Sequence, residues 1–73
     1  MERNHHWYEI RVVGRLGDTI LAAFPEFHAQ TERGHTILTG ELPDRPALYG
    51  IVARIESLGL ELVDLHRLSK GAT

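Results

Sequence analysis

The chain of 73 residues contains no cysteine and no long apolar run. Without cysteine it can form neither a disulfide framework nor a thiolate metal site, and nothing in the composition implies an oxidising compartment. No apolar stretch approaches the roughly 20 residues of a membrane-spanning helix. The N-terminal sequence MERNHHWYEI also lacks the apolar core of a signal peptide. We therefore expect a cytoplasmic protein that does not engage a membrane.

A basic excess is missing as well, because eight Lys and Arg residues face ten Asp and Glu residues, for a formal net charge of −2. A nucleic-acid surface needs such an excess or a clustered basic stripe, and here the charges are interspersed. The glycine-bearing turn over residues 14–18 lacks the lysine and hydroxyl of a phosphate-binding loop, and no hydroxyl sits at a strand-to-helix elbow. We expect no nucleic-acid partner, no cofactor and no catalytic residue, so a non-enzymatic role is favoured over an enzymatic one.

Residues 44–68 carry the clearest structural pattern of the chain. An apolar stripe recurs with the 3.6-residue period of a helix at Leu48, Ile51, Val52, Ile55 and Leu58. Asp44 is placed to cap the first turn, Pro46 stands where a missing N–H is tolerated, and Gly59 supplies a left-handed residue that ends the helix. The alternating segment 60–65 that follows is typical of a strand.

Upstream, the alternation of apolar and polar residues over 7–16 predicts a half-buried strand. Asp18 or Thr19 could cap a short helix over residues 20–24, which Pro25 must end because the residue before a proline is pushed out of helical geometry. This helix of little more than one turn is the weakest element in the pattern.

A hairpin is predicted next, with strands over 27–32 and 35–42 joined by Arg33 and Gly34, where glycine accepts a positive φ. The resulting order, strand, helix, strand, strand, helix, strand, is the ferredoxin-like α+β arrangement. Right-handed crossovers give one antiparallel sheet of order 4-1-3-2 with both helices on one face. A ββαβ-type sheet with one helix is the alternative if the short helix is a loop. We expect a single domain over 1–73 with an ordered core over about 7–68.

One face of such a sheet stays uncovered, and alternation predicts which side chains occupy it. Five of them are large and apolar: Trp7, Val13, Ile37, Leu62 and Leu68. A contiguous apolar patch usually marks an interface, and a chain this short buries only about 60 per cent of its unfolded surface. We therefore expect a homo-oligomer, most simply a dimer, formed through this face or along a strand edge, with Arg11, Arg15, Glu9 and Asp64 as a charged rim. The alternative is a monomer that exposes some apolar surface.

Five histidines are many for this length. Antiparallel pairing brings the start of the first strand beside the end of the fourth, which makes His5, His6 and His66 weak candidates for a metal site or a pH switch. No helical H-x-x-x-H motif supports them, so we favour solvated surface histidines and expect no bound metal. A candidate site for a ligand or a proton comprises His66, Glu9, Glu41 and His28.

The strings YEIRVVGRL and HTILTGELPDRPALYGIVARIESLGLELVDLHRL resemble a family of very short, mostly actinobacterial proteins with the pattern Y-x-I-R-V-x-G-x-L, then T-x-L-T-G-x-x-x-D-x-x-A-L-x-G-x-x-x-R-I-x-x-L-G-L-x-L. The resemblance supports the order of elements and transfers no activity. It includes Gly50, which costs a helix about 1 kcal/mol relative to alanine and would mark a close approach to the sheet or to another chain.

The pattern thus favours a small self-associating or ligand-binding module that uses the open face of its sheet. One alternative is an enzyme of the dimeric α+β barrel type, with a pocket between paired sheets and a proton handled by the candidate site. The other is a metal-binding or pH-sensing protein built on the histidines.

Overall fold

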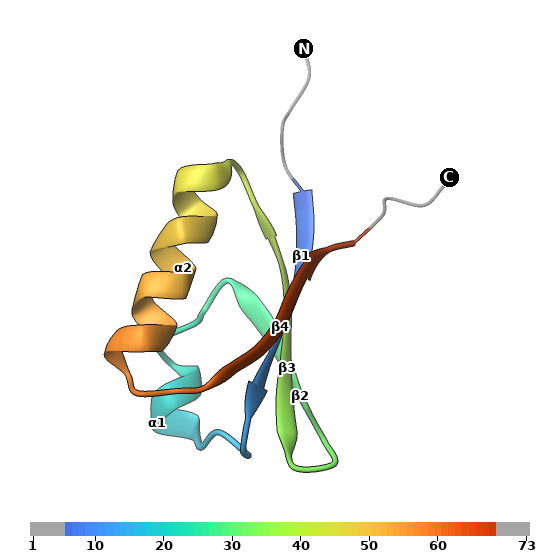
Figure 1. Ribbon diagram of the computed structural model, residues 1–73, viewed down its shortest axis with the longest axis vertical. Helices are drawn as coiled ribbons and strands as arrows, with labels where there is room; N and C mark the ends of the chain where they lie inside the picture. Colours follow the sequence, from blue (N-terminus) through green and yellow to red (C-terminus); the bar gives the residue numbers. More distant parts are fainter. Residues whose placement is uncertain (1–5, 69–73) are drawn as a thin grey trace.

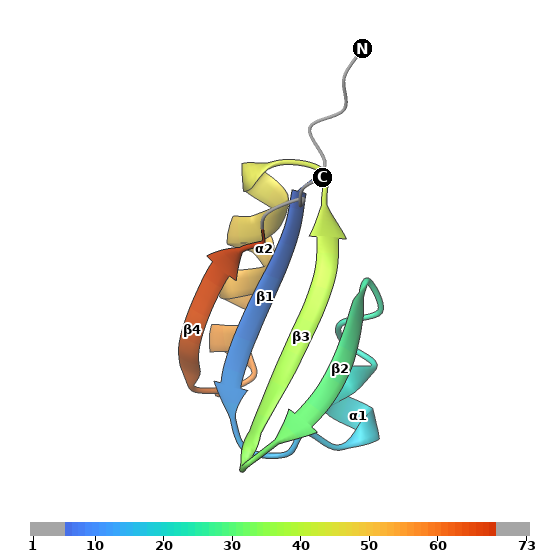
Figure 2. The same ribbon diagram turned by 90° about the vertical axis from the view of Figure 1, so that its right-hand side faces the viewer.

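The computed structural model describes residues 6–68, which form an α+β fold of four strands and two helices. These elements are β1 (His6–Val13), α1 (Asp18–Leu21), β2 (Phe27–Glu32), β3 (His35–Leu42), α2 (Arg45–Ser57) and β4 (Leu62–Arg67). The strands make one antiparallel sheet of order β2-β3-β1-β4, which is the predicted 4-1-3-2 read from its other edge. Both helices lie on one face of the sheet, and the other face is uncovered (Figures 1 and 2).

The hairpin of β2 and β3 has the predicted boundaries. Its two linking residues, Arg33 and Gly34, have φ of 49° and 81°. Positive φ at both central positions is the backbone of a type I′ turn, whose twist matches that of the paired strands. This turn fixes the register in which Glu32 lies opposite His35 and His28 lies opposite Thr39.

Helix α2 begins and ends at the predicted signals. The Asp44 side chain accepts a hydrogen bond from the Ala47 N–H at 2.9 Å, so the N-cap is confirmed. At the other end Gly59 has φ of 75°, and the N–H of Leu60 donates to the Ile55 carbonyl at 3.1 Å. This second bond is the long-range bond of a Schellman motif and satisfies a carbonyl that the helix leaves unpaired. At 13 residues α2 is the longer helix, and neither helix within 6–68 is long and apolar enough to cross a membrane.

The first strand is shorter than predicted, because Gly14 turns the chain with φ of 94°. Its N–H donates to the Gly34 carbonyl at 2.7 Å, and its carbonyl accepts from the Thr36 hydroxyl at 2.7 Å. Arg15 therefore lies in the connection between β1 and α1, and its predicted place on the outward face of a strand is wrong.

The cap of α1 also differs from the prediction. Gly17 is the N-cap residue, and no side chain makes a capping hydrogen bond there, so neither Asp18 nor Thr19 has that role. The helical hydrogen bonds continue as turns through Phe24, whose N–H donates to the Leu21 carbonyl, and the chain then leaves at Pro25 as expected.

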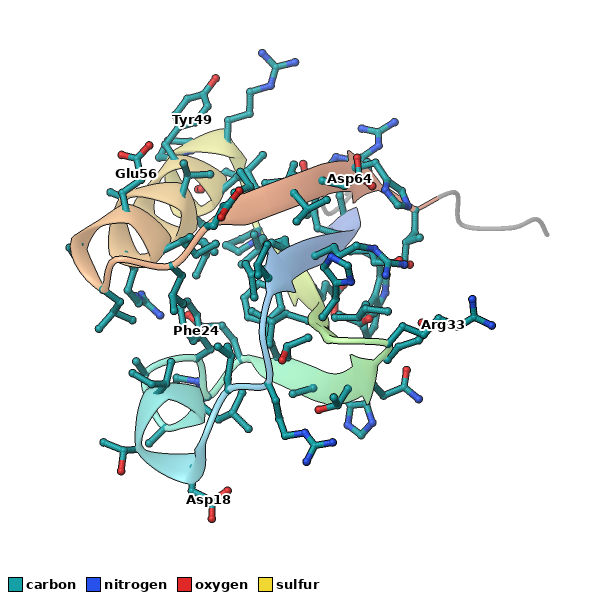
Figure 3. The ribbon with its side chains drawn as sticks, turned by 60° about the horizontal axis from the view of Figure 1, so that its bottom comes forward. Asp18, Phe24, Arg33, Tyr49, Glu56 and Asp64 are labelled. Atoms are coloured by element: carbon teal, nitrogen blue, oxygen red, sulfur yellow. The ribbon has the colours of Figure 1, made fainter. Side chains whose placement is uncertain are left out.

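The core lies between the sheet and the helices. Its buried members are Tyr8, Ile10, Val12, Phe24, Leu38, Leu42, Ile51 and Ile55. The inward alternation predicted for β1 and β3 is thus confirmed, as is the apolar stripe of α2 around Ile51 and Ile55. Figure 3 shows Phe24 in the space between the two helices, with Tyr49 and Glu56 on the side of α2 away from the sheet.

Arg54 connects α2 to the segment that leads into β2. Its guanidinium donates to the Ala23 carbonyl at 2.7 Å and to the Glu26 carboxylate at 3.3 Å. The same group lies 5.6 Å from the centroid of the Phe24 ring, within the range of a cation–π interaction. Arg54 is a structural residue that helical periodicity alone assigns to the solvent face.

We expect Arg54→Met to lower the free energy of unfolding by about 2 kcal/mol, because a charged hydrogen bond to a half-buried carbonyl and the ring contact are both lost. Urea unfolding followed by circular dichroism measures this. The matched variant Glu26→Gln removes only the exposed ion pair and should change stability by less than about 1 kcal/mol. Equal losses in the two variants would show that the carbonyl and ring contacts contribute nothing.

Candidate functional site

The candidate site is the face of the sheet opposite the helices, here called the open face. Residues that lie directly opposite on neighbouring strands share a face. Along β1 the open face carries Trp7, Glu9, Arg11 and Val13. Two rows of paired residues cross the middle of this face. The Glu9 row contains His28, Thr39, Glu9 and His66, and the Arg11 row contains Gln30, Ile37, Arg11 and Asp64.

The apolar side chains of the open face do not form a contiguous patch. Trp7 and Val13 are each 42% exposed, but they lie at opposite ends of β1 with two charged residues between them. Ile37 is only 7% exposed although it belongs to the open face, because Arg11 and Gln30 flank it in the same row. The expected contiguous patch is therefore wrong, and two separate apolar groups take its place.

Leu62 is not on the open face, contrary to the prediction. The pairing of β4 with β1 shifts by one residue, so that Asp64 lies opposite Arg11 but Leu62 lies opposite Val12. Val63 is left over as a bulge, and a one-residue slip sends a side chain to the other face. Leu62 thus belongs to the helix-facing side, where it is still 39% exposed at the sheet edge. Leu68 follows β4, is half-buried, and its N–H donates to the Trp7 carbonyl at 2.7 Å.

The charged groups gather where β1 meets β4. His66 Nδ1 lies 3.0 Å from Asp64 Oδ2, and His66 Nε2 lies 3.9 Å from Glu9 Oε1. The side chain of His66 is 47% exposed and that of Asp64 55% exposed, so water screens both contacts. Arg11 lies opposite Asp64 in the Arg11 row. Figure 3 shows Asp64 on the side of β4 away from the helices.

This arrangement can orient an imidazole but does not enclose it. The Asp64 carboxylate at one ring nitrogen orients the His66 imidazole, and the Glu9 carboxylate lies near the other nitrogen. General acid–base catalysis needs in addition a site that holds a substrate against the imidazole. In a single copy of the chain the cluster faces open solvent.

The other candidate residues of the ligand or proton site are spread over the sheet. His28 lies in the Glu9 row, together with Glu9 and His66, but it is on the edge strand β2, two strands away from Glu9. Glu41 lies opposite Trp7, toward the end of β3. The four predicted residues thus share the open face, and His66 and Glu9 lie near one another, at 3.9 Å.

A metal site gains no support from the part of the chain that the structure describes. Within residues 6–68 no group of three or more His, Asp or Glu residues could hold a metal ion. His6 lies opposite Leu42 on the helix-facing side, whereas His66 lies on the open face. His5 falls outside the described residues.

Two members of the open face escaped sequence reasoning, Gln30 and His35, whereas Thr39 was correctly predicted to face outward. The signal that could have found them is the turn at Arg33 and Gly34, because a two-residue hairpin loop fixes every pair between β2 and β3. His35 lies opposite Val13, so it extends the polar surface to the far end of β1.

Comparison with known proteins places the chain in a family. Residues 7–66 match the model of a family described as a domain of unknown function, DUF8691. The search of curated proteins and the search of solved structures returned no match. The matched range begins at the exposed Trp7 and ends at His66, so it takes in all four strands of the sheet.

Proposed function

The chain belongs to the DUF8691 family, and from the geometry of its sheet we propose that it is a small, non-enzymatic module that self-associates through the open face. The single observation that carries this proposal is the composition of that face. Exposed apolar groups stand at both ends of β1, and charges of both signs stand between them. Trp7 and Val13 offer apolar contacts to another protein, and the charges between them offer ion pairs that fix the register of the contact.

The size of the core supports the same proposal. Nine apolar residues are buried in the described structure, and one of them, Ile37, lies on the open face outside the main cluster. Domains of this length bury a smaller share of their unfolded surface than longer domains do, and they are marginally stable alone. Covering the open face with a second copy would add apolar burial at Trp7 and Val13, which are each 42% exposed in the single chain.

We also infer that the fold is ferredoxin-like. The strand order, the antiparallel directions and the placement of both helices on one face support a ferredoxin-like fold. In that arrangement the uncovered face is the surface available for pairing. We also propose a cytoplasmic location and kinship with the short, mostly actinobacterial proteins whose pattern the sequence resembles.

Val13→Asp tests the proposal, because it places a charge on one of the two exposed apolar groups. We expect an oligomer that becomes a monomer, with its molar mass in solution measured by light scattering over a concentration series. Tyr49→Asp is the matched control, since it removes an exposed apolar group from α2, on the other side of the molecule. An oligomer of unchanged mass in Val13→Asp, or a monomeric parent protein, would contradict association through the open face.

One observation favours a second candidate, an enzyme of the dimeric α+β barrel type. His66 contacts Asp64 and lies near Glu9 on the same face, and two paired sheets would convert this exposed cluster into an enclosed one. An elongated cavity between the sheets would support this candidate, whereas a dry, filled interface would support the structural module.

A further inference from the structure

We propose that the open face pairs with a second copy of this chain in one register, around a two-fold axis that crosses the strands at the level of Ile10. This inference rests on the proposed self-association and specifies its geometry. A two-fold interface requires that the same surface be complementary to itself. The open face meets that requirement for a rotation about this axis.

The order of side chains along β1 is the first argument. The outward residues are Trp7, Glu9, Arg11 and Val13, which read apolar, acidic, basic, apolar. Reversal about Ile10 gives the same sequence with the two charges exchanged. The rotation therefore places Glu9 opposite Arg11 of the second copy and Trp7 opposite Val13 of the second copy. Trp7 and Val13 are equally exposed, at 42% each, so the two apolar groups gain cover from one another.

The neighbouring strands obey the same relation. On β4, Asp64 stands in the row of Arg11 and His66 in the row of Glu9. The rotation thus places Asp64 opposite His66 of the second copy. On β3, His35 stands in the row of Val13 and Glu41 in the row of Trp7, so these two residues also meet. An imidazole faces a carboxylate at both positions.

Three other two-fold axes centred on β1 fail the test of charge. An axis along β1 would place Glu9 against Glu9 and Arg11 against Arg11. An axis across the strands at either of these residues would again place that residue against itself. Like charges that are directly opposed are destabilising. The axis at Ile10 places strand β1 over its own copy. This is compatible with aligned packing of two sheets, in which the strand directions differ by no more than about 30° and the sheets lie about 10 Å apart.

Crosslinking tests this register directly, since the chain has no cysteine of its own. His35→Cys and Glu41→Cys would be made as two separate variants and treated with a bismaleimide that spans about 10 Å, the separation of packed sheets. We expect covalent dimers from an equal mixture of the two variants and none from either variant alone. Two copies of position 35 lie roughly 20 Å apart in the proposed register, because each is three residues of about 3.3 Å from the axis.

Charge exchange tests the same register by affinity. Glu9→Arg and Arg11→Glu should each raise the dissociation constant about 100-fold or more, because each creates two like-charge contacts. The double variant Glu9→Arg/Arg11→Glu should return to within about tenfold of the parent value, because the pairs are restored in reverse. Analytical ultracentrifugation measures the constants, and a cooperative thermal melt shows that each variant is folded.

The outcomes separate this inference from the proposal on which it rests. Crosslinking of His35→Cys alone, or a dimer that the mixture does not crosslink, overturns the register and leaves self-association standing. A double charge variant as weak as the single ones overturns it too. A monomeric parent protein overturns both. If the charge variants fail to fold, the cysteine variants still decide, because positions 35 and 41 lie outside the core.

Discussion

Gly40→Ala is expected to cost this fold about 3 kcal/mol or more. A Cβ built at Gly40 would stand 2.7 Å from the Glu26 carbonyl oxygen and 2.8 Å from Phe27 Cδ2. Real Cβ atoms do not approach so closely, so the chain must move. Forcing a group into a well-packed site costs about 1–3 kcal/mol, and more where the obstacle is backbone.

The position of Gly40 explains why the structure has little room to adjust. It lies between Tyr8 of β1 and Phe27 of β2 in an interior strand, with hydrogen-bonded neighbours on both sides. Its backbone φ is not in the left-handed region, so the requirement for glycine is one of space. A domain of 73 residues has roughly 4–11 kcal/mol of stability to lose.

The measurement is urea and thermal unfolding followed by circular dichroism. Gly50→Ala is the matched control, because the same methyl group there would meet nothing within 4 Å. Removing glycine from an exposed helix position should stabilise the protein by about 0.5–1 kcal/mol. A Gly40→Ala variant that unfolds within about 1 kcal/mol of the parent protein would show that the contact with Glu26 relaxes freely.

The same pair of glycines shows what local pattern can and cannot reveal. A glycine within a helix is conspicuous, and Gly50 was expected to mark a close approach to the sheet or to another chain. The approach to the sheet is wrong, because within the chain the space around Gly50 is open. The close approach is at Gly40, which looks unremarkable in a strand of alternating residues. Helical periodicity concerns one element, whereas contact between Gly40 and Phe27 depends on how two strands pair and how the side chain of the second one lies.

Elements specified by neighbouring residues were therefore predictable. The hairpin of β2 and β3 and the caps of α2 depend on turn and capping residues within a few positions of one another, and both match the prediction. The one-residue shift opposite Val12 depends on the pairing of β4 with β1, two segments about 50 residues apart. That shift moved Leu62 to the other face and removed it from the candidate site.

The sequence could predict which side chains lie on the open face, but not how exposed each of them is. Alternation correctly placed Glu9, Asp64 and His66 on the open face. Exposure could not be predicted in this way, because the burial of Ile37 is produced by Arg11 and Gln30 on other strands. The self-complementary order of side chains on the open face becomes visible only when the pairing of residues across the sheet is known.

Thr36→Val should lower the free energy of unfolding by about 2–3 kcal/mol, although it changes the shape of the side chain very little. The Thr36 hydroxyl donates to the Gly14 carbonyl at 2.7 Å and accepts from the Leu16 N–H at 3.1 Å. The side chain is 1% exposed, so water cannot replace it. Valine would leave both backbone groups of the β1–α1 connection without a partner, and an unsatisfied buried group costs about 1–3 kcal/mol.

Two variants isolate the hydroxyl as the cause. Thr36→Ser keeps both hydrogen bonds and loses one buried methyl group, which should cost about 1 kcal/mol. Thr39→Val makes the same substitution on the open face, where the Thr39 hydroxyl makes no hydrogen bond within residues 6–68. It should change the free energy of unfolding by less than about 0.5 kcal/mol. Chemical denaturation gives the three values. Because the hydroxyl joins β3 to a connection 20 residues upstream, a Thr36→Val variant as stable as Thr39→Val would mean that this connection is held by the packing of Leu16 and not by its hydrogen bonds.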